Sequence, residues 1–300
     1  MIHVVSKVED ANCITHSGTM HADEVFSTAF LDLFLGEVFV YRTNSIESID
    51  TSSISYIYDI GRGEFDHHQG DALKRKDGIT YCSFGLLWKK LGKDFLKKYG
   101  IELVDEVWNG VDKDFVEGID ADDNGVFPKI EAIYKVKTIS NIIKLFNPSY
   151  DSLEEESSQF EKACGVAKSI LEEEILYING KCYAEKQVME YLEEMDENAK
   201  YLVLDHFLPY EDCLLAQEKA NSILYVAYPS NRGGYAIKVL PKNVNDRSAR
   251  VPFPEEWAGL EGEVLEEKSG ISGLTFCHMG RFIVNCRDLD TVYQVFDKIC

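Results

Sequence analysis

Histidines and acids are concentrated in three short segments near the start of this 300-residue sequence. Five of the seven histidines lie within the first 68 residues. The side chains that could do chemistry there are His16, His21, Asp23, Asp59, Asp66, His67 and His68. Imidazole nitrogens mixed with carboxylate oxygens suit Mn, Co, Zn or Fe, whereas an all-oxygen set would favour Mg or Ca. The sequence therefore predicts a divalent-metal site.

A parallel α/β sheet would bring these segments together. In residues 1–125, short apolar runs alternate with helical patterns, which is typical of such a sheet. Ligands bind beyond the carboxyl ends of parallel strands. If residues 14–15 and 57–59 belong to neighbouring strands, the loops that carry His16 and His67 meet at one edge, with Asp59 between them.

The number of candidate donors exceeds the needs of one ion. Six or seven side chains, with an Asp able to bridge, fit two metals about 3.5–4 Å apart, as in hydrolytic two-metal sites. Such a pair polarises a phosphoryl oxygen and makes hydroxide from water at neutral pH. Taken alone, His16 is an ordinary helix-start residue and Asp59 an ordinary turn residue. The adjacent pair His67–His68 has little structural use, and the combination of segments favours a metal site.

The whole sequence predicts two α/β domains. Residues 1–180 are expected to form a metal-binding catalytic domain, and residues 181–300 are expected to form a smaller domain with a helical connection and substrate-binding elements. The periodicities predict the following elements: strands at 38–41, 55–60, 201–204, 223–227 and 235–240; helices at 22–35, 84–91, 101–116 and 288–299; an acidic helical region at 153–199 interrupted near 179–180; and a hairpin turn at 231–234.

Charge and composition narrow the function classes. With 31 basic and 52 acidic residues, the net charge of −21 argues against binding duplex nucleic acid over a broad basic face. No apolar run reaches the roughly 18 residues of a membrane helix, and the first residues lack a signal-peptide pattern. The eight cysteines include no C-x-x-C pair. We therefore expect reduced thiols, no membrane partner and a cytoplasmic protein.

Four motifs give the sequence a resemblance to known proteins. Asp66-His67-His68 matches the signature triplet of the DHH phosphoesterase superfamily. The segments at 16–24, 59–61, 65–69 and 120–125 resemble the melanocyte-proliferating-gene exonuclease family, as do late segments at 240–242, 250–257, 269–271 and 276–278. This resemblance covers nearly the whole chain. It implies a DHH-like N-terminal domain and a metal-dependent 3′–5′ exonuclease acting on RNA.

The resemblance also assigns site residues. It implies metal ligands at His16, His21, Asp23, Asp59, Asp66, His67 and Asp120 or Asp123, with Asp66, His67 and His68 in catalysis. We favour Asp120, since Asp123 could cap the turn at Asn124–Gly125. The superfamily's usual Asp-x-Asp is His21-Ala-Asp23 here, which shifts the preference from Mg towards Mn, with Co and Zn as alternatives.

A polyanionic substrate also needs cations. Residues 230–250 hold five cations and one acid, and we expect Lys242, Arg250 and His278 to bind RNA or a short single-stranded oligonucleotide. Two other functions stay open: a phosphohydrolase acting on pyrophosphate or a nucleotide phosphate, and a non-catalytic metal-binding scaffold. An oligomer is compatible with the sequence.

Overall fold

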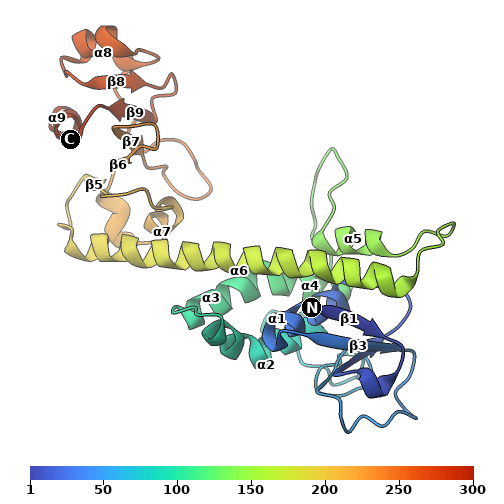
Figure 1. Ribbon diagram of the computed structural model, residues 1–300. Coiled ribbons are helices and arrows are strands. Elements are labelled where there is room, and N and C mark those ends of the chain that lie inside the picture. Colours follow the sequence, from blue (N-terminus) through green and yellow to red (C-terminus); the bar gives the residue numbers. More distant parts are fainter. The chain divides into compact units, whose positions relative to one another are not determined.

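The computed structural model describes all 300 residues and divides the chain into two compact units, Met1–Gly180 and Lys181–Cys300 (Figure 1). Each unit has its own sheet and its own buried apolar residues. Strands and helices occur in both, which confirms the α/β fold class. The eight cysteines are all free, and none of the helices combines the length and apolar content needed to span a membrane.

The N-terminal unit is built on a four-stranded parallel sheet in the order β1-β3-β2-β4. Its strands are β1 (Ile2–Val5), β2 (Cys13–His16), β3 (Val38–Thr43) and β4 (Tyr56–Ile57). The predicted strands at 38–41 and 55–60 are therefore confirmed, the second in a shorter form. The pairing of β2 with β4 confirms that the ends of these two strands are neighbours.

Helices pack around this sheet through an aromatic core. They are α1 (Ala22–Leu35), α2 (Ser83–Lys98), α3 (Val104–Val111), a π-helical turn (Asp112–Val116), α4 (Glu117–Asp123) and α5 (Ile139–Ile143). Phe30 of α1 meets the rings of Phe84, Trp88 and Phe95 of α2 edge-on. Each fully buried ring of this size contributes about 1.5–3 kcal/mol, so α1 and α2 are held firmly together.

Helix α6 (Glu156–Glu194) runs without a break, so the predicted interruption near residues 179–180 is wrong. Its buried side chains continue at helical spacing on both sides of Gly180, from Leu171, Ile175 and Ile178 to Ala184 and Val188. A glycine inside a helix costs only about 1 kcal/mol relative to alanine. The continued burial of this apolar stripe outweighs that cost.

The C-terminal unit contains a mixed sheet in the order β5-β6-β7-β9-β8. Its strands are β5 (Tyr201–Val203), β6 (Tyr225–Pro229), β7 (Tyr235–Val239), β8 (Leu274–Cys277) and β9 (Ile283–Cys286). Strands β6 and β7 form the predicted antiparallel hairpin. The sequence analysis did not predict the β8–β9 pair, whose strands are only four residues each.

Short helices complete the C-terminal unit: α7 (Glu211–Leu215), α8 (Gly262–Ser269) and α9 (Leu289–Ile299). Helix α9 confirms the predicted helix at the end of the chain, and Asp288 caps its start by accepting a hydrogen bond from the backbone N–H of Thr291. The chain also has 3₁₀ helices at Val8–Asp10, Lys144–Phe146, Glu218–Ser222 and Glu255–Trp257.

Candidate metal centre

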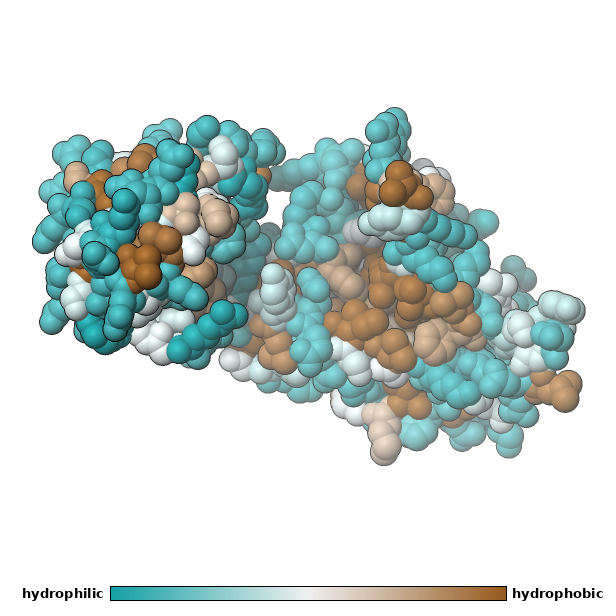
Figure 2. All heavy atoms as spheres, turned by 90° about the horizontal axis from the view of Figure 1, so that it is seen from above, coloured by the Kyte–Doolittle hydropathy of each residue, from teal (hydrophilic) through white to brown (hydrophobic).

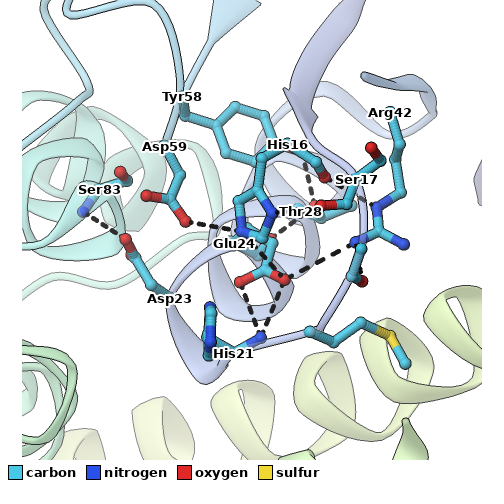
Figure 3. A network of polar contacts seen from close by, with 12 residues as sticks. His16, Ser17, His21, Asp23, Glu24, Thr28, Arg42, Tyr58, Asp59 and Ser83 are labelled. Atoms are coloured by element: carbon cyan, nitrogen blue, oxygen red, sulfur yellow. Dashed lines mark hydrogen bonds and ion pairs between the residues drawn. The ribbon is translucent and has the colours of Figure 1, made fainter. Parts of the chain in front are cut away.

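The candidate site lies where β2 and β4 end. His16 is the last residue of β2, Asp59 follows β4, and Asp23 and Glu24 lie in the first turn of α1. In the close view of Figure 3, the side chains of His16, Asp59 and Glu24 point toward one another from these separate elements. The parallel pairing of β2 and β4 thus brings together segments that are more than 40 residues apart, as the sequence predicts.

Asp59 contacts three histidines. Its Oδ2 atom lies 3.2 Å from His16 Nε2, and its Oδ1 atom lies 3.5 Å from His67 Nε2 and 3.6 Å from His68 Nδ1. The backbone of Asp59 has φ 54°, in the left-handed region that Asp and Asn tolerate better than other non-glycine residues. A backbone in this sparsely populated region is the kind of strain that concentrates at functional sites.

Three groups of possible metal donors surround Asp59. In each group, the donor atoms lie within 4.8 Å of one another. The groups are His16 with His21 and Glu24, Asp59 with His67 and His68, and Asp23 with His67 and Asp123. The structure therefore gathers most of the predicted ligands and adds Glu24. The sequence analysis did not assign Glu24, although its position next to Asp23 in a helical first turn was a usable signal.

Asp23 is oriented by the start of helix α2. Its two carboxylate oxygens accept hydrogen bonds from the backbone N–H groups of Ser83 (2.9 Å) and Phe84 (2.6 Å). The first N–H groups of a helix have no partner within the helix and attract negative charge. Asp23 thereby satisfies two of them, while its Oδ2 atom also lies 3.7 Å from His67 Nε2.

Asp120 and Asp123, the two alternative ligands of the sequence analysis, have different surroundings in the structure. Asp120 is fully buried, and its carboxylate accepts hydrogen bonds from Arg75 Nε (2.6 Å) and from the backbone N–H of Cys82 (2.9 Å). Asp123 instead lies 3.2 Å from His67 Nε2. A side chain on Gly85 would collide with Asp120, since its Cβ atom would lie 2.2 Å from Oδ1. Asp120 thus fixes the start of α2, and Asp123 belongs to the donor cluster.

Asp66 lies beside the cluster rather than in any of the three donor groups. It accepts hydrogen bonds from the backbone N–H groups of Arg62 (2.6 Å) and His68 (3.1 Å), and its Oδ1 atom lies 2.7 Å from His68 Nδ1. Burial raises the pKa of Asp66, but these contacts outweigh it and lower the pKa below its usual value. Asp66 therefore holds the loop that carries His67 and orients His68.

The electrostatics of the cluster show a strongly negative site. Burial lowers the pKa of His16, but the carboxylates of Asp59 and Glu24 outweigh this effect and raise it to about 11. Burial also lowers the pKa of His67, but the carboxylates of Asp59, Asp23 and Asp123 outweigh this effect and raise it to about 9. Burial, together with the charges of Asp59 and Asp123, raises the pKa of Asp23. Such a site attracts cations.

Two buried atoms of the cluster lack hydrogen-bond partners. They are Asp59 Oδ1 and His67 Nε2, one in a carboxylate and one in an imidazole. Buried polar atoms are nearly always paired, so unpaired ones need an explanation. Both atoms belong to groups that ligate divalent metals, and their mixed nitrogen and oxygen chemistry fits a first-row transition ion. The residues present therefore fit a metal site.

A cavity of about 790 Å³ lies over the cluster. Its walls include His16, His21, Asp59, His67, His68 and Asp123. His68 is exposed, with 60% of its side chain accessible. A phosphoester could therefore reach the candidate donors from solvent through this cavity.

The predicted substrate-binding residues Lys242, Arg250 and His278 all lie in the C-terminal unit. Lys242 is exposed and lies 3.6 Å from Asp246. His278 accepts a hydrogen bond from the backbone N–H of Gly280 (2.9 Å) in the turn between β8 and β9. These two side chains remain accessible, and their role in binding stays a prediction.

Arg250 has a different environment from the one expected of a phosphate clamp. Its guanidinium donates to the backbone carbonyls of Pro241 (3.0 Å), Ala220 (2.8 Å) and Ile223 (2.7 Å). Nε and Nη1 thus tie Arg250 to two other chain segments, while Nη2 has no hydrogen-bond partner in the protein. These bonds give Arg250 a structural role, and its role in substrate binding stays a prediction.

Replacement of Arg250 with alanine should accordingly weaken the fold of the C-terminal unit. The carbonyls that lose their donor are partly buried, and each such loss costs about 1–3 kcal/mol. We expect a lower melting temperature for this unit in calorimetry. The KM for oligonucleotides, measured on the same variant, tests the predicted contact with substrate separately, and unchanged stability would contradict the structural role.

Comparison with known proteins places the chain in a family. Residues 12–299 match the family model MYG1_exonuc, described as Uncharacterised protein family (UPF0160). A MYG1 protein of Chlamydia pneumoniae is 30% identical over 284 residues, covering 90% of this chain and 89% of the relative. A MYG1 protein of Dictyostelium discoideum is 27% identical over 92% of each chain.

The human protein called MYG1 exonuclease is 26% identical over 303 residues, covering 90% of this chain and 80% of the human one. No solved structure gives a significant match. The placement in the wider DHH superfamily stays a prediction. The family match spans nearly the full length and includes both units, and the chain therefore belongs to the MYG1_exonuc family (UPF0160).

Proposed function

We propose that this protein is a metal-dependent phosphodiesterase, and specifically a 3′–5′ exonuclease that shortens RNA or short single-stranded oligonucleotides. The observation that carries the proposal is the pair of unpaired buried atoms, Asp59 Oδ1 and His67 Nε2, among donor groups that line an open cavity. The human and bovine relatives are named MYG1 exonuclease, which supports the same reaction class.

The donor groups would hold the metal. We propose two ions, with Mn²⁺ preferred, bound by His16, His21, Asp23, Glu24, Asp59, His67 and Asp123. When bound, such ions polarise a phosphoryl oxygen and lower the pKa of coordinated water. The seven donors around Asp59 support more than one ion, since a single tetrahedral ion would leave three of them without a metal and a single octahedral ion would leave one.

His68 is placed to move a proton. Its Nδ1 atom lies 2.7 Å from Asp66 Oδ1, so in the neutral ring the proton resides on Nδ1 and Nε2 is free to accept another. The ring lines the cavity and is the part of the Asp66–His68 pair that solvent reaches. We assign His68 as the general base or acid of hydrolysis, with Asp66 as the residue that positions it.

The division of labour between the units follows from these positions. Catalysis is assigned to the N-terminal unit, which contains every donor named above. The C-terminal unit, with Lys242 and His278, is proposed to take part in substrate binding. The eight free cysteines support a reducing compartment such as the cytoplasm.

The test is a metal and hydrolysis assay on the full chain. Protein purified without chelator is expected to contain Mn-like ions by elemental analysis and to convert a 5′-labelled oligoribonucleotide into a ladder of shorter labelled products. EDTA should abolish the ladder, and Mn²⁺ should restore it. Immediate release of a labelled mononucleotide would mean the opposite direction of digestion.

Two other results would contradict the proposal. Phosphate release from pyrophosphate without any shortening of oligonucleotides would assign a small-molecule phosphohydrolase. Metal binding without hydrolysis of either substrate, with Mn²⁺, Co²⁺, Zn²⁺ or Mg²⁺ added, would assign a non-catalytic metal-binding protein.

A further inference from the structure

Residues 126–144 form a basic segment in an acidic protein. The segment joins α4 to α5 and ends just after α5. It holds four lysines, Lys129, Lys135, Lys137 and Lys144, and one acid, Glu131, which gives a local charge of +3 in a chain of net charge −21. The sequence analysis did not single it out, because its apolar residues dilute the charge.

All four lysines are exposed, and none of their ammonium groups forms an ion pair or a hydrogen bond in the structure. The basic stretch at residues 230–250 differs in this respect. There, Lys238 and Arg247 both pair with Glu211, and Lys242 lies near Asp246. Three of the five cations in that stretch are therefore offset by acids, whereas all four lysines of the basic segment are available to a ligand.

Aromatic and aliphatic side chains of the basic segment are exposed as well. Phe127 is 67% exposed, Tyr134 is 74% exposed, and Ile133 is fully exposed. The segment includes the pale green loop that rises beside α5 in Figure 1. Seen from above in Figure 2, apolar surface is gathered on this face of the N-terminal unit, with hydrophilic surface around it. Exposed rings between free lysines are a typical combination for binding single-stranded nucleic acid.

The basic segment borders the cavity that holds the metal cluster. Phe127 and Lys144 both line that cavity, together with His21, Asp59 and His67. A second cavity of about 280 Å³ lies within the segment and shares Phe127 with the first. Phe127 therefore contacts both cavities, the one that holds the candidate metal donors and the one that Tyr134 lines.

The ends of the basic segment are fixed to the elements of the site. The backbone N–H of Val126 donates to the carbonyl of Ala121 (2.8 Å), and Thr138 Oγ1 donates to Asp122 Oδ2 (2.8 Å), which joins the segment to α4. Beyond α5, the side-chain amide of Asn147 exchanges hydrogen bonds with the backbone N–H (2.7 Å) and carbonyl (2.9 Å) of Met20, next to His21. Lys144 is thus held at the wall of the cavity.

From these observations we infer that the basic segment binds the single-stranded nucleic acid whose end enters the metal cavity. This inference rests on the proposed function and names the surface that would give it a polymeric substrate. Phe127 and Tyr134 stack on successive bases, Lys144 contacts the phosphate nearest the metal cluster, and Lys129, Lys135 and Lys137 contact phosphates farther along the strand. A duplex would not fit this role, because its stacked bases are not available to the two rings.

The experiment measures binding and hydrolysis separately in the full-length protein. Binding is measured by fluorescence anisotropy with a labelled oligouridylate of about ten nucleotides in EDTA, where metal-dependent cleavage is absent. The variant K129A/K135A/K137A is expected to bind roughly 10-fold more weakly at low salt. Its slope of log K against log salt should be smaller by about 2, at 0.7 per lost phosphate contact.

The double variant F127A/Y134A tests stacking. It is expected to raise the Kd about 10-fold for each ring while leaving the salt slope unchanged, because no charge is removed. The matched control is K7A/K76A/K186A, which removes three exposed lysines elsewhere and causes the same change in net charge. This control should bind within about 2-fold of the wild type, since long-range charge is largely screened.

Hydrolysis of bis(para-nitrophenyl) phosphate with Mn²⁺ separates this inference from the proposed function. The side chains of Lys129, Lys135 and Lys137 do not line the metal cavity, so K129A/K135A/K137A and the control should hydrolyse this small diester at the wild-type rate. Absence of this activity in the wild type would refute the proposed function, whatever the oligonucleotide binding. Wild-type oligonucleotide binding by both segment variants, with hydrolysis intact, would overturn the inference alone.

Two further results would also overturn it. One is binding of the wild type to anionic phospholipid vesicles, lost in the segment variants, with no measurable oligonucleotide binding. The other is a wild-type dimer in light scattering that F127A/Y134A converts to a monomer without any change in oligonucleotide binding. Either result would show that the exposed rings and lysines bind a lipid surface or a second copy of the chain instead of nucleic acid.

Discussion

Replacement of Asp59 with asparagine is expected to reduce phosphodiester hydrolysis by about 10²–10³-fold or more, the loss typical when a charged group that organises a catalytic site is removed. Asp59 contacts His16, His67 and His68, so the loss of its charge affects the centre of the donor cluster. Asparagine has the same shape and also tolerates the left-handed backbone at this position.

The measurement is a steady-state rate with a phosphodiester at saturating Mn²⁺, together with the metal content of the purified variant. The circular dichroism spectrum should be unchanged, which shows that the fold survives. Asp71→Asn is the matched control, since Asp71 is an exposed acid farther along the same loop. Wild-type rates and metal content in Asp59→Asn would show that Asp59 does not bind the metal.

Replacement of Arg75 with methionine is expected to destabilise the N-terminal unit by about 3–5 kcal/mol, the usual cost of removing one partner from a buried ion pair. Arg75 donates to Asp120 (2.6 Å) and, with two nitrogens, to Asp112 (2.7 and 2.9 Å). Methionine retains much of the side-chain volume but leaves the fully buried carboxylate of Asp120 without a cation.

The loss should depend on pH. Burial raises the pKa of Asp120 to about 6 even though Arg75 and Cys82 lower it, so removal of Arg75 raises this pKa further. A carboxyl whose pKa is higher in the folded state favours folding while it is protonated and opposes folding once it ionises. The Arg75→Met variant should therefore lose more stability at pH 8 than at pH 5, values on either side of about 6.

Calorimetry at these two pH values gives the measurement. The double variant Arg75→Met/Asp120→Asn removes the stranded charge and is expected to regain part of the lost stability, with a weaker pH dependence. Arg232→Met, at an exposed position, should change stability by no more than about 0.5 kcal/mol. Equal losses in the single and double variants would show that Asp120 does not depend on Arg75.

The sequence predicted the part of the site that depends on local pattern. Helix α1 begins and ends at the predicted residues, and β2 pairs with β4 as expected. Both results follow from apolar spacing and from the rule that parallel strands end at the same edge. The convergence of His16, Asp59 and His67 could therefore be predicted from the sequence.

Residues that depend on distant partners could not be predicted in this way. Asp120 and Asp123 are one turn apart in α4, and only the positions of Arg75 and Cys82, about 40 residues upstream, decide which of them faces the cluster. The sequence does not reveal the partners of Arg250, because they are backbone carbonyls and every residue has one. Side-chain type alone does not show which charges are already in use.

The binding of Asp23 to the first amides of α2 has a consequence for incompletely folded chains. A carboxylate that must engage Ser83 and Phe84 reaches its working position only after that helix has docked. Chains that are still folding, or that have been damaged in the core, therefore lack an assembled hydrolytic centre. Phosphoester hydrolysis is thereby restricted to intact molecules, and nascent or misfolded copies lack it.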